Sequence, residues 1–285
     1  MNQLSAVTAM RAPAVFRRRE GASIAAIMRT LTATRYVAPL HEGGSLPAIV
    51  EANDEGLYVL KFRGAGQGPK ALIAELVAGE IARVAGLPVP EIVFIELDAD
   101  LARTEPDPEI QELIRASAGL NVGLDYLPGS VMFDSVAFKP DPVLASAIVW
   151  FDAFVSNVDR TAKNTNLLVW HRALRLIDHG AALYFHHSWE KYLERSRDPF
   201  TRIKDHVLLP YASALKDADE RLSKLVTLER VREIVAQIPD AWLTETAVFE
   251  TPEKNRQAYV DYFQQRLTPP HAFIEEAIRA RSLLV

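Results

Sequence analysis

The stretch Phe154–Trp170, FVSNVDRTAKNTNLLVW, places a short polar loop between two strongly apolar runs. The loop contains Asp159, Arg160, Asn164 and Asn166. Loops that are held by a rigid scaffold often carry functional residues. A loop that combines a carboxylate with amide side chains is typical of a site that holds a hydroxyl group and a metal ion near a phosphate.

The composition limits the class of protein. The chain has 285 residues, of which 49% are hydrophobic and 24% charged, which is ordinary for a soluble globular protein and long enough for two lobes. The net charge of −5 argues against general binding to nucleic acid or anionic membranes. No apolar run approaches the roughly 20 residues that span a bilayer. The absence of cysteine excludes disulfides and fits a reducing cytoplasm.

Residues 1–28 differ from the rest of the chain. This segment is rich in Ala and Arg, and Arg11 and Arg17–Arg19 interrupt its apolar runs, which makes it a poor secretory signal. We expect an extension outside the folded lobes, with a transit-like or partner-binding arm as the alternative.

Residues 29–127 predict a β-rich lobe with one long helix. The runs LPAIVEA and LYVLKFR flank Asn-Asp-Glu-Gly at 53–56, which predicts a hairpin. A helix is expected over 69–85 because Pro69 can begin it and Gly86 and Pro88 can end it. A strand is expected at 91–97, a loop and short helix at 98–120, and a short strand before the Pro-Gly turn at 128–129.

Residues 128–285 predict a mainly helical lobe. PVLASAIVWFDAFVSN is an apolar helix suited to the centre of a second core. NLLVW and LRLID predict a small hairpin after the polar loop, and amphipathic helices follow from Pro210 onward. The predicted fold class is therefore α+β with two lobes, and the functional site is expected in the cleft between them.

The polar loop and the hairpin predict a phosphotransferase site. Phosphoryl transfer requires a positioned nucleophile and metal ions that neutralise the phosphates. Asp159 offers a carboxylate near the attacking hydroxyl, and Asn164 and Asp178 offer the oxygen ligands that Mg²⁺ prefers. The hairpin should return Asp178 to the loop. Asn166 is interpreted as a turn residue, and Asp152 as a structural carboxylate that braces the loop from below.

Six motifs in this order resemble those of the HipA-like kinases, a divergent branch of the protein-kinase-like superfamily. The polar loop also resembles that of phosphatidylinositol kinases. The six are GGS at 43–45, VLKF, AELVAGEIARVAGLPVPE, DYLPGS at 125–130, NVDRTAKNTNLL and LIDHG. The resemblance runs from about residue 29 to the C-terminus and implies a bilobal protein-kinase-like fold.

The resemblance implies roles for the nucleotide-binding positions. Lys61 resembles the lysine that grips the nucleotide phosphates, and Glu75 resembles its ion-pair partner. Glu80 is the alternative partner, although Glu80 can instead pair with Arg83 at the surface. The remaining nucleotide contacts implied by the family are the loop over the phosphates and the backbone of the adenine-binding hinge, at Gly43, Gly44, Ser45, Leu124, Asp125 and Tyr126.

For the chemistry, Asp159 resembles the catalytic base, and Asn164 and Asp178 resemble the magnesium ligands. The chain departs from the eukaryotic pattern at His179, which replaces the usual Phe after the metal-binding Asp. An Ala-Pro-Glu motif is also missing from the sequence, which leaves the peptide-docking region open.

The sequence thus predicts an ATP- and Mg²⁺-dependent kinase that acts on a Ser or Thr hydroxyl of a protein. Kinases of small molecules or lipid headgroups share the same active-site residues, and a non-catalytic nucleotide-binding module is a third alternative. The family resemblance adds an antitoxin-like protein as a candidate partner and Ser45 as a candidate site of self-phosphorylation.

Overall fold

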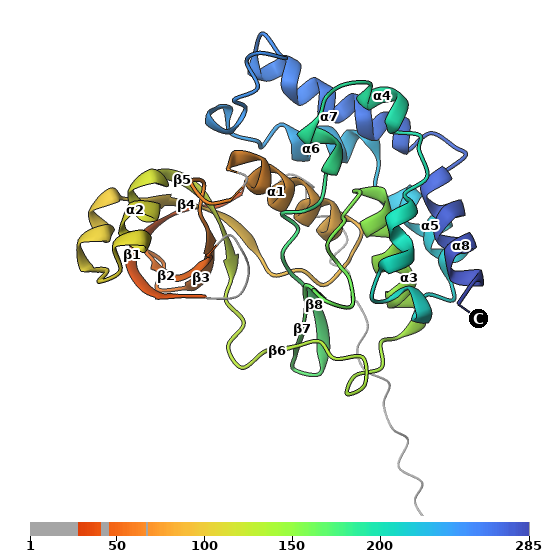
Figure 1. The fold of residues 1–285 in the computed structure, drawn as a ribbon, viewed down its shortest axis with the longest axis horizontal. Coiled ribbons are helices and arrows are strands. Elements are labelled where there is room, and N and C mark those ends of the chain that lie inside the picture. Colours follow the sequence, from red (N-terminus) through yellow and green to blue (C-terminus); the bar gives the residue numbers. More distant parts are fainter. Residues whose placement is uncertain (1–27, 41–45, 67, 285) are drawn as a thin grey trace, which may run out of the picture.

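The computed structural model describes residues 28–40, 46–66 and 68–284. They form a β-rich lobe and a larger helical lobe that lie side by side, with helix α1 (Pro69–Val84) between them (Figure 1). Outside the described residues lie the expected N-terminal extension up to residue 27 and the expected phosphate loop at Gly43, Gly44 and Ser45.

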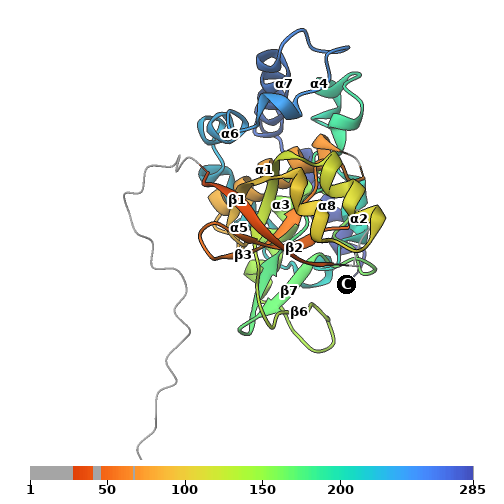
Figure 2. The same cartoon turned by 90° about the vertical axis from the view of Figure 1, so that its left-hand side faces the viewer.

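The smaller lobe is built on a closed five-stranded barrel. Its strands are ordered β1-β2-β3-β5-β4, and they span Thr30–Pro39 (β1), Ala48–Ala52 (β2), Leu57–Lys61 (β3), Gly119–Asp125 (β5) and Ile92–Leu97 (β4). The predicted β2–β3 hairpin is confirmed. Strand β1 was not predicted, and its parallel pairing with β4 closes the sheet on itself. Figure 2 shows the barrel from the side on which β1, β2 and β3 face the viewer.

A separate hydrophobic core fills this barrel. Leu60 and Val93 are fully buried there, together with residues of the segment that covers the barrel, such as Ile114. That segment consists of the 3₁₀ helix η1 (Ala99–Thr104) and helix α2 (Pro108–Ala116). The short helix predicted within 98–120 is α2, whereas η1 occupies the part that was expected to be a loop. Asp98 and Asp107 cap the two helices by accepting backbone N–H bonds from the residue two positions on.

The middle of helix α1 is buried on all sides. It starts at Pro69 and ends before Gly86, whose φ of 74° favours glycine. Every residue from Leu72 to Gly79 is buried, as expected for a helix that contacts protein on each face. A Cβ atom at Gly79 would lie 2.2 Å from Ile92 Cδ1, so the absence of a side chain lets α1 approach β4 closely.

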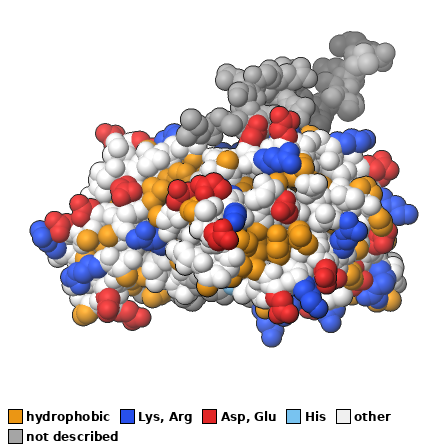
Figure 3. Space-filling model, turned by 90° about the horizontal axis from the view of Figure 1, so that it is seen from above, with side chains coloured by type: hydrophobic (Ala, Val, Ile, Leu, Met, Phe, Trp, Pro, Cys, Tyr) orange, Lys and Arg blue, Asp and Glu red, His pale blue; other side chains and the backbone are white. Residues whose placement is uncertain are grey.

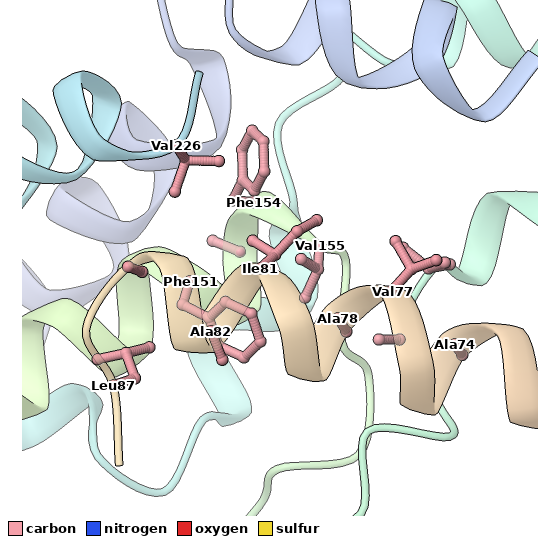
Figure 4. Packing of buried hydrophobic residues seen from close by; sticks show 14 of the residues in the cluster. Ala74, Val77, Ala78, Ile81, Ala82, Leu87, Phe151, Phe154, Val155 and Val226 are labelled. Atoms are coloured by element: carbon pink, nitrogen blue, oxygen red, sulfur yellow. The ribbon is translucent and has the colours of Figure 1, made fainter. Parts of the chain in front are cut away.

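The larger core surrounds helix α3 (Pro142–Phe154). Side chains of α1, including Ile81 and Ala82, pack against Phe151 and Val155 at the end of α3 (Figure 4), so one hydrophobic cluster joins the two lobes. The predicted hairpin after the polar loop is confirmed as β7 (Leu167–Trp170) and β8 (Ala173–Leu176), and β6 (Val131–Met132) extends it to three strands.

The remaining elements of the larger lobe are helices and short 3₁₀ turns. They are η2 (Tyr184–His187), α4 (Tyr192–Arg195), η3 (Thr201–Asp205), η4 (Leu209–Tyr211), α5 (Leu215–Leu225), α6 (Leu228–Val235), η5 (Asp240–Trp242), α7 (Pro252–Arg266) and α8 (Ala272–Ser282).

The C-terminal part of the chain also contacts the barrel directly. The indole of Trp242 is buried, donates through Nε1 to the Leu120 carbonyl at 3.2 Å, and meets the Phe94 ring edge-on at 5.6 Å. Lys70 at the start of α1 pairs with Glu245 at 2.6 Å. These contacts hold the barrel and α1 on the helical lobe.

One face of the molecule carries mixed charge. On the face seen from above, Lys and Arg side chains are interspersed with Asp and Glu (Figure 3). Among the described residues, the structure contains no helix that is both long and apolar enough to cross a membrane.

Candidate active site

The polar loop gathers its side chains around Asp159. The Oδ2 atom of Asp159 accepts hydrogen bonds from Asn164 Nδ2 at 2.6 Å and from Asn166 Nδ2 at 3.2 Å. Both amide groups turn their NH₂ toward the carboxylate, which leaves Asn164 Oδ1 available as an oxygen ligand. Asn166 has a φ of 47°, a backbone conformation that Asn tolerates, but its side chain donates to Asp159 and not to nearby backbone as a turn residue would.

Asp152 lies beneath the loop and is completely buried. It accepts hydrogen bonds from Arg160 Nε at 2.6 Å, His206 Nε2 at 2.9 Å and Asn157 Nδ2 at 2.8 Å. Burial alone would raise the pKa of Asp152, but the charges and hydrogen bonds of Arg160 and His206 outweigh it and hold the pKa far below its usual range. The predicted bracing role is confirmed.

Arg160 connects the loop to the segment that carries Asp178. Its guanidinium is buried and donates through Nη1 to the Asn166 carbonyl and, at 3.4 Å, to the Ile177 carbonyl. The backbone N–H of Ile177 donates to the Asn166 carbonyl at 3.1 Å. The β7–β8 hairpin therefore returns the chain to the loop, one residue before Asp178.

Lys61 at the end of β3 forms an ion pair with Asp178, with 2.9 Å between Nζ and Oδ1. Burial favours the neutral lysine, but Asp178 and Glu75 outweigh it and raise the pKa of Lys61. Burial alone would likewise raise the pKa of Asp178, and the ammonium group of Lys61 reverses that effect and lowers it. Both groups are therefore charged near neutral pH.

Glu75 contacts the residue after Asp178. Its Oε2 accepts the backbone N–H of His179 at 2.9 Å, and its Oε1 lies 3.1 Å from His179 Nδ1. In the described part of the chain, the ion pair of Lys61 is thus formed with Asp178, and both oxygens of Glu75 are directed at His179. The imidazole also packs edge-on against Phe151, with 5.8 Å between the ring centroids. Glu80 pairs with Arg83.

The expected hinge lies at the end of β5. Leu124 is paired on both sides, with Val59 of β3 and Ile92 of β4. The N–H of Asp125 donates to the Glu91 carbonyl at 2.9 Å, and the N–H of Tyr126 donates to the Leu57 carbonyl at 3.0 Å. These two N–H groups bond within the barrel, so neither is free in this structure to receive an adenine base as the resemblance implies.

The donor set suits a hard metal ion. Asn164 offers an amide oxygen, and Asp178 offers carboxylate oxygens that an ammonium group already neutralises. Mg²⁺ prefers such ligands and retains water or phosphate oxygens at its other positions. No cluster of three or more His, Asp or Glu side chains with metal-binding geometry was found among the residues that the structure describes.

Four residues of the site were not assigned these roles from the sequence. They are Asn157, Arg160, His179 and His206, and each contacts a carboxylate of the site. The neighbours Asn157, Arg160 and His179 adjoin motif residues, so their positions in the chain were a usable signal. His206 reaches Asp152 from a segment without regular periodicity, and no sequence signal pointed to it.

A family model described as HipA-like kinase matches residues 34–270. The chain belongs to the HipA-like kinase family. The resemblance predicted from the six motifs is confirmed, and membership supports a kinase-type phosphotransferase activity for this HipA-like kinase.

Two solved structures of low sequence identity resemble this HipA-like kinase. The Helicobacter pylori proinflammatory kinase CtkA superposes with a TM-score of 0.52 and 14% identity, covering 88% of this chain and 99% of that one. The Golgi casein kinase with Mn/ADP bound gives 0.48 and 11%, covering 89% and 73%. The likeness to the first confirms the predicted bilobal, protein-kinase-like fold. No curated protein matches the sequence significantly.

Proposed function

We propose that this HipA-like kinase transfers the terminal phosphate of ATP to a hydroxyl group, and that the acceptor is a Ser or Thr of a protein. One observation carries the proposal: Arg160 and the Asn166–Ile177 backbone bond hold the Asp159 loop against the segment in which Asp178 pairs with Lys61. These contacts support a site in which the carboxylate of Asp159, the amide oxygen of Asn164 and the Lys61–Asp178 pair act together on one phosphate.

Each group has a distinct task in the proposed reaction. The acceptor oxygen forms a bond to the terminal phosphorus, the bond from that phosphorus to the bridging oxygen breaks, and its electron pair leaves with ADP. Asp159 orients the acceptor hydroxyl and takes its proton. Lys61 stabilises the phosphate charge. Asn164 and Asp178 would hold Mg²⁺, which supplies neutralising charge to the phosphate oxygens.

The test compares wild type with Asp159→Asn in single-turnover transfer of labelled terminal phosphate. The amide keeps the size of the side chain but has neither the charge nor the basicity of the carboxylate. We expect normal ATP affinity and transfer slowed by at least ~10²-fold. Equal rates would place the base elsewhere, and tight ATP binding without transfer to any acceptor would favour the non-catalytic alternative.

The acceptor is identified in the same assay. Purified protein is incubated with labelled ATP and a lysate, and the label is then separated into protein, lipid and small-molecule fractions. Label on protein in a form that Asp159→Asn does not produce supports the proposed acceptor, and Ser45 is the first position to map for self-phosphorylation. Label confined to lipid or small molecules would replace the protein acceptor by that class.

A further inference from the structure

We propose that His179 is a positioning residue through which Glu75 fixes the metal-binding carboxylate of Asp178. The inference rests on the proposed function, because it assigns Asp178 to the metal. In this arrangement Glu75 does not form the ion pair with Lys61. It forms hydrogen bonds from helix α1 to His179, the residue that follows Asp178.

The geometry of the contact is bidentate. Glu75 lies in the middle of α1 and has both oxygens on His179, one on the backbone N–H and one on the imidazole. Both side chains are buried, with exposed fractions of 2% for Glu75 and 0% for His179. A two-point contact fixes the orientation of the peptide that joins Asp178 to His179, and hence the direction of the Asp178 side chain.

A comparison with a phenyl ring indicates that the imidazole of His179 is present for its hydrogen bond to Glu75. Its Nε2 is buried without a hydrogen-bond partner among the described residues, and an unpaired buried polar atom is unfavourable. A phenyl ring would fill the same space against Phe151 without that penalty. The bond to Glu75 is therefore the feature that an imidazole provides at this position and a phenyl ring does not.

Asp178 needs such support because its backbone is in an uncommon conformation. Its φ is 53°, in the left-handed region that L-residues other than Gly adopt at an energetic cost. The surroundings must hold this conformation, and α1 is suited to do so because its middle, which carries Glu75, is buried and packs in the larger core. Glu75 thus transmits the rigidity of α1 to the segment that presents Asp178.

The decisive experiment compares one substitution of His179 that removes the side-chain hydrogen bond with another that removes the ring packing. His179→Phe keeps the packing against Phe151 and the backbone N–H bond to Glu75, and it loses the bond made by the imidazole. His179→Asn keeps an N–H donor near the position of Nδ1 and loses the ring. The readouts are the affinity for Mn²⁺–ADP by calorimetry, the Mg²⁺ concentration that gives half-maximal transfer, and the melting temperature without ligand.

We expect His179→Phe to lower the Mn²⁺–ADP affinity by about 10–100-fold, the scale for losing a residue that orients a metal ligand. Its half-saturating Mg²⁺ concentration should rise in parallel, with a smaller change in the maximal rate. His179→Asn should have the lower melting temperature of the two but retain most of the affinity. A purely structural role would give the reverse order, with affinity following melting temperature.

Substitutions of Glu75 test whether it acts as the hydrogen-bond partner of His179 or as the charge partner of Lys61. Gln at this position can accept the His179 N–H with its oxygen and donate to Nδ1 with its NH₂, so Glu75→Gln should retain most of the affinity that Glu75→Ala loses. If Glu75 acted as the charge partner of Lys61, the two variants would lose affinity alike. These variants decide the matter even if His179→Phe does not fold.

The outcomes separate this inference from the proposed function. Wild type that binds no Mn²⁺–ADP and transfers no phosphate would overturn the proposed function. Wild type that binds and transfers, together with a His179→Phe variant of unchanged Mn²⁺–ADP affinity and Mg²⁺ dependence, would overturn the positioning role alone.

Discussion

At the scale of single residues, the candidate site depends on a guanidinium group buried beneath its loop. Arg160 is 1% exposed and satisfies Asp152, while its other bonds hold the backbone of Asn166 and Ile177. A buried ion pair contributes little net stability relative to apolar residues, but removal of one partner leaves an uncompensated charge. We infer that the main effect of the Arg160–Asp152 pair is to hold the loop in one conformation.

The first prediction concerns this pair. Asp152→Ala should lower the free energy of unfolding by about 3–5 kcal/mol, because Arg160 then remains buried without its carboxylate. Asp159→Asn is the matched control, since a half-buried loop residue that keeps its size should leave the melting temperature close to that of wild type. Denaturant titrations measure both. An Asp152→Ala variant as stable as wild type would contradict the bracing role.

A second residue-scale prediction concerns pH. His271 Nδ1 lies 2.9 Å from Asp219 Oδ1, which also accepts from Trp150 Nε1 at 2.6 Å. The hydrogen bond to Asp219 raises the pKa of His271 above 6.5 against the opposing effects of burial and Arg266. A raised folded-state pKa gives stability that is complete below the unfolded pKa and is lost as pH rises through the folded one.

Wild type should therefore exceed His271→Ala in stability by about 1.5–3 kcal/mol near pH 6, the scale of a hydrogen bond to a charged group. The difference should shrink toward pH 9. It should also shrink in strong acid, because Asp219 has a lowered pKa and is protonated there. Melting temperatures of both proteins across this range provide the measurement, and a difference independent of pH would contradict the assignment.

At the scale of elements, helix α1 depends on the absence of a side chain at Gly79. A methyl group there would overlap Ile92 Cδ1. Gly79→Ala should destabilise the protein by about 1–3 kcal/mol through overpacking. In an Ile92→Val background the overlapping atom is gone, and the same change should be neutral or stabilising by up to about 1 kcal/mol because Ala favours a helix. A double-mutant cycle without coupling would show that the contact does not limit the approach.

Elements with local signals could be predicted from the sequence, and elements defined by distant partners could not. The helix at Pro69–Val84 has its own start and stop residues. Strand β1 lacks a clear alternation because its pairing with β2 contains two register shifts, between Ala33 and Arg35 and between Tyr36 and Ala38. Its pairing with β4 leaves no trace in either segment alone.

The same distinction holds in the candidate site. Lys61, Asp159, Asn164 and Asp178 stand in motifs with fixed spacing, so the sequence alone nominated them. The choice of Asp178 as the partner of Lys61, and of His179 as the partner of Glu75, depends on distances between segments that motifs do not encode.

At the scale of the whole molecule, the barrel has its own core, while α1 shares a core with the helical lobe. Trp242 lies at this junction. Trp242→Ala should lower the free energy of unfolding by about 3–5 kcal/mol. Trp242→Phe keeps an aromatic contact with Phe94 and loses the bond to Leu120, so its loss should be smaller. Denaturant titration of both variants tests this. Equal stability of Trp242→Ala and wild type would show that the contacts of Trp242 at the junction do not contribute to the free energy of unfolding.

The closed barrel also has a consequence for synthesis of the chain. Strands β1, β2 and β3 leave the ribosome before β4, whose residues Phe94–Glu96 pair with Thr30–Thr32. Until then β1 has an unpaired edge, and such edges recruit other chains. After β4 has paired with β1, the outer edges of β3 and β4 stay unpaired until β5 is made. We expect nascent chains that are stalled before residue 125 to bind chaperones, and chains released with the barrel complete to escape them. Strand β5 (Gly119–Asp125) pairs with both β3 and β4, so its synthesis sets the moment during translation at which the barrel no longer exposes an edge.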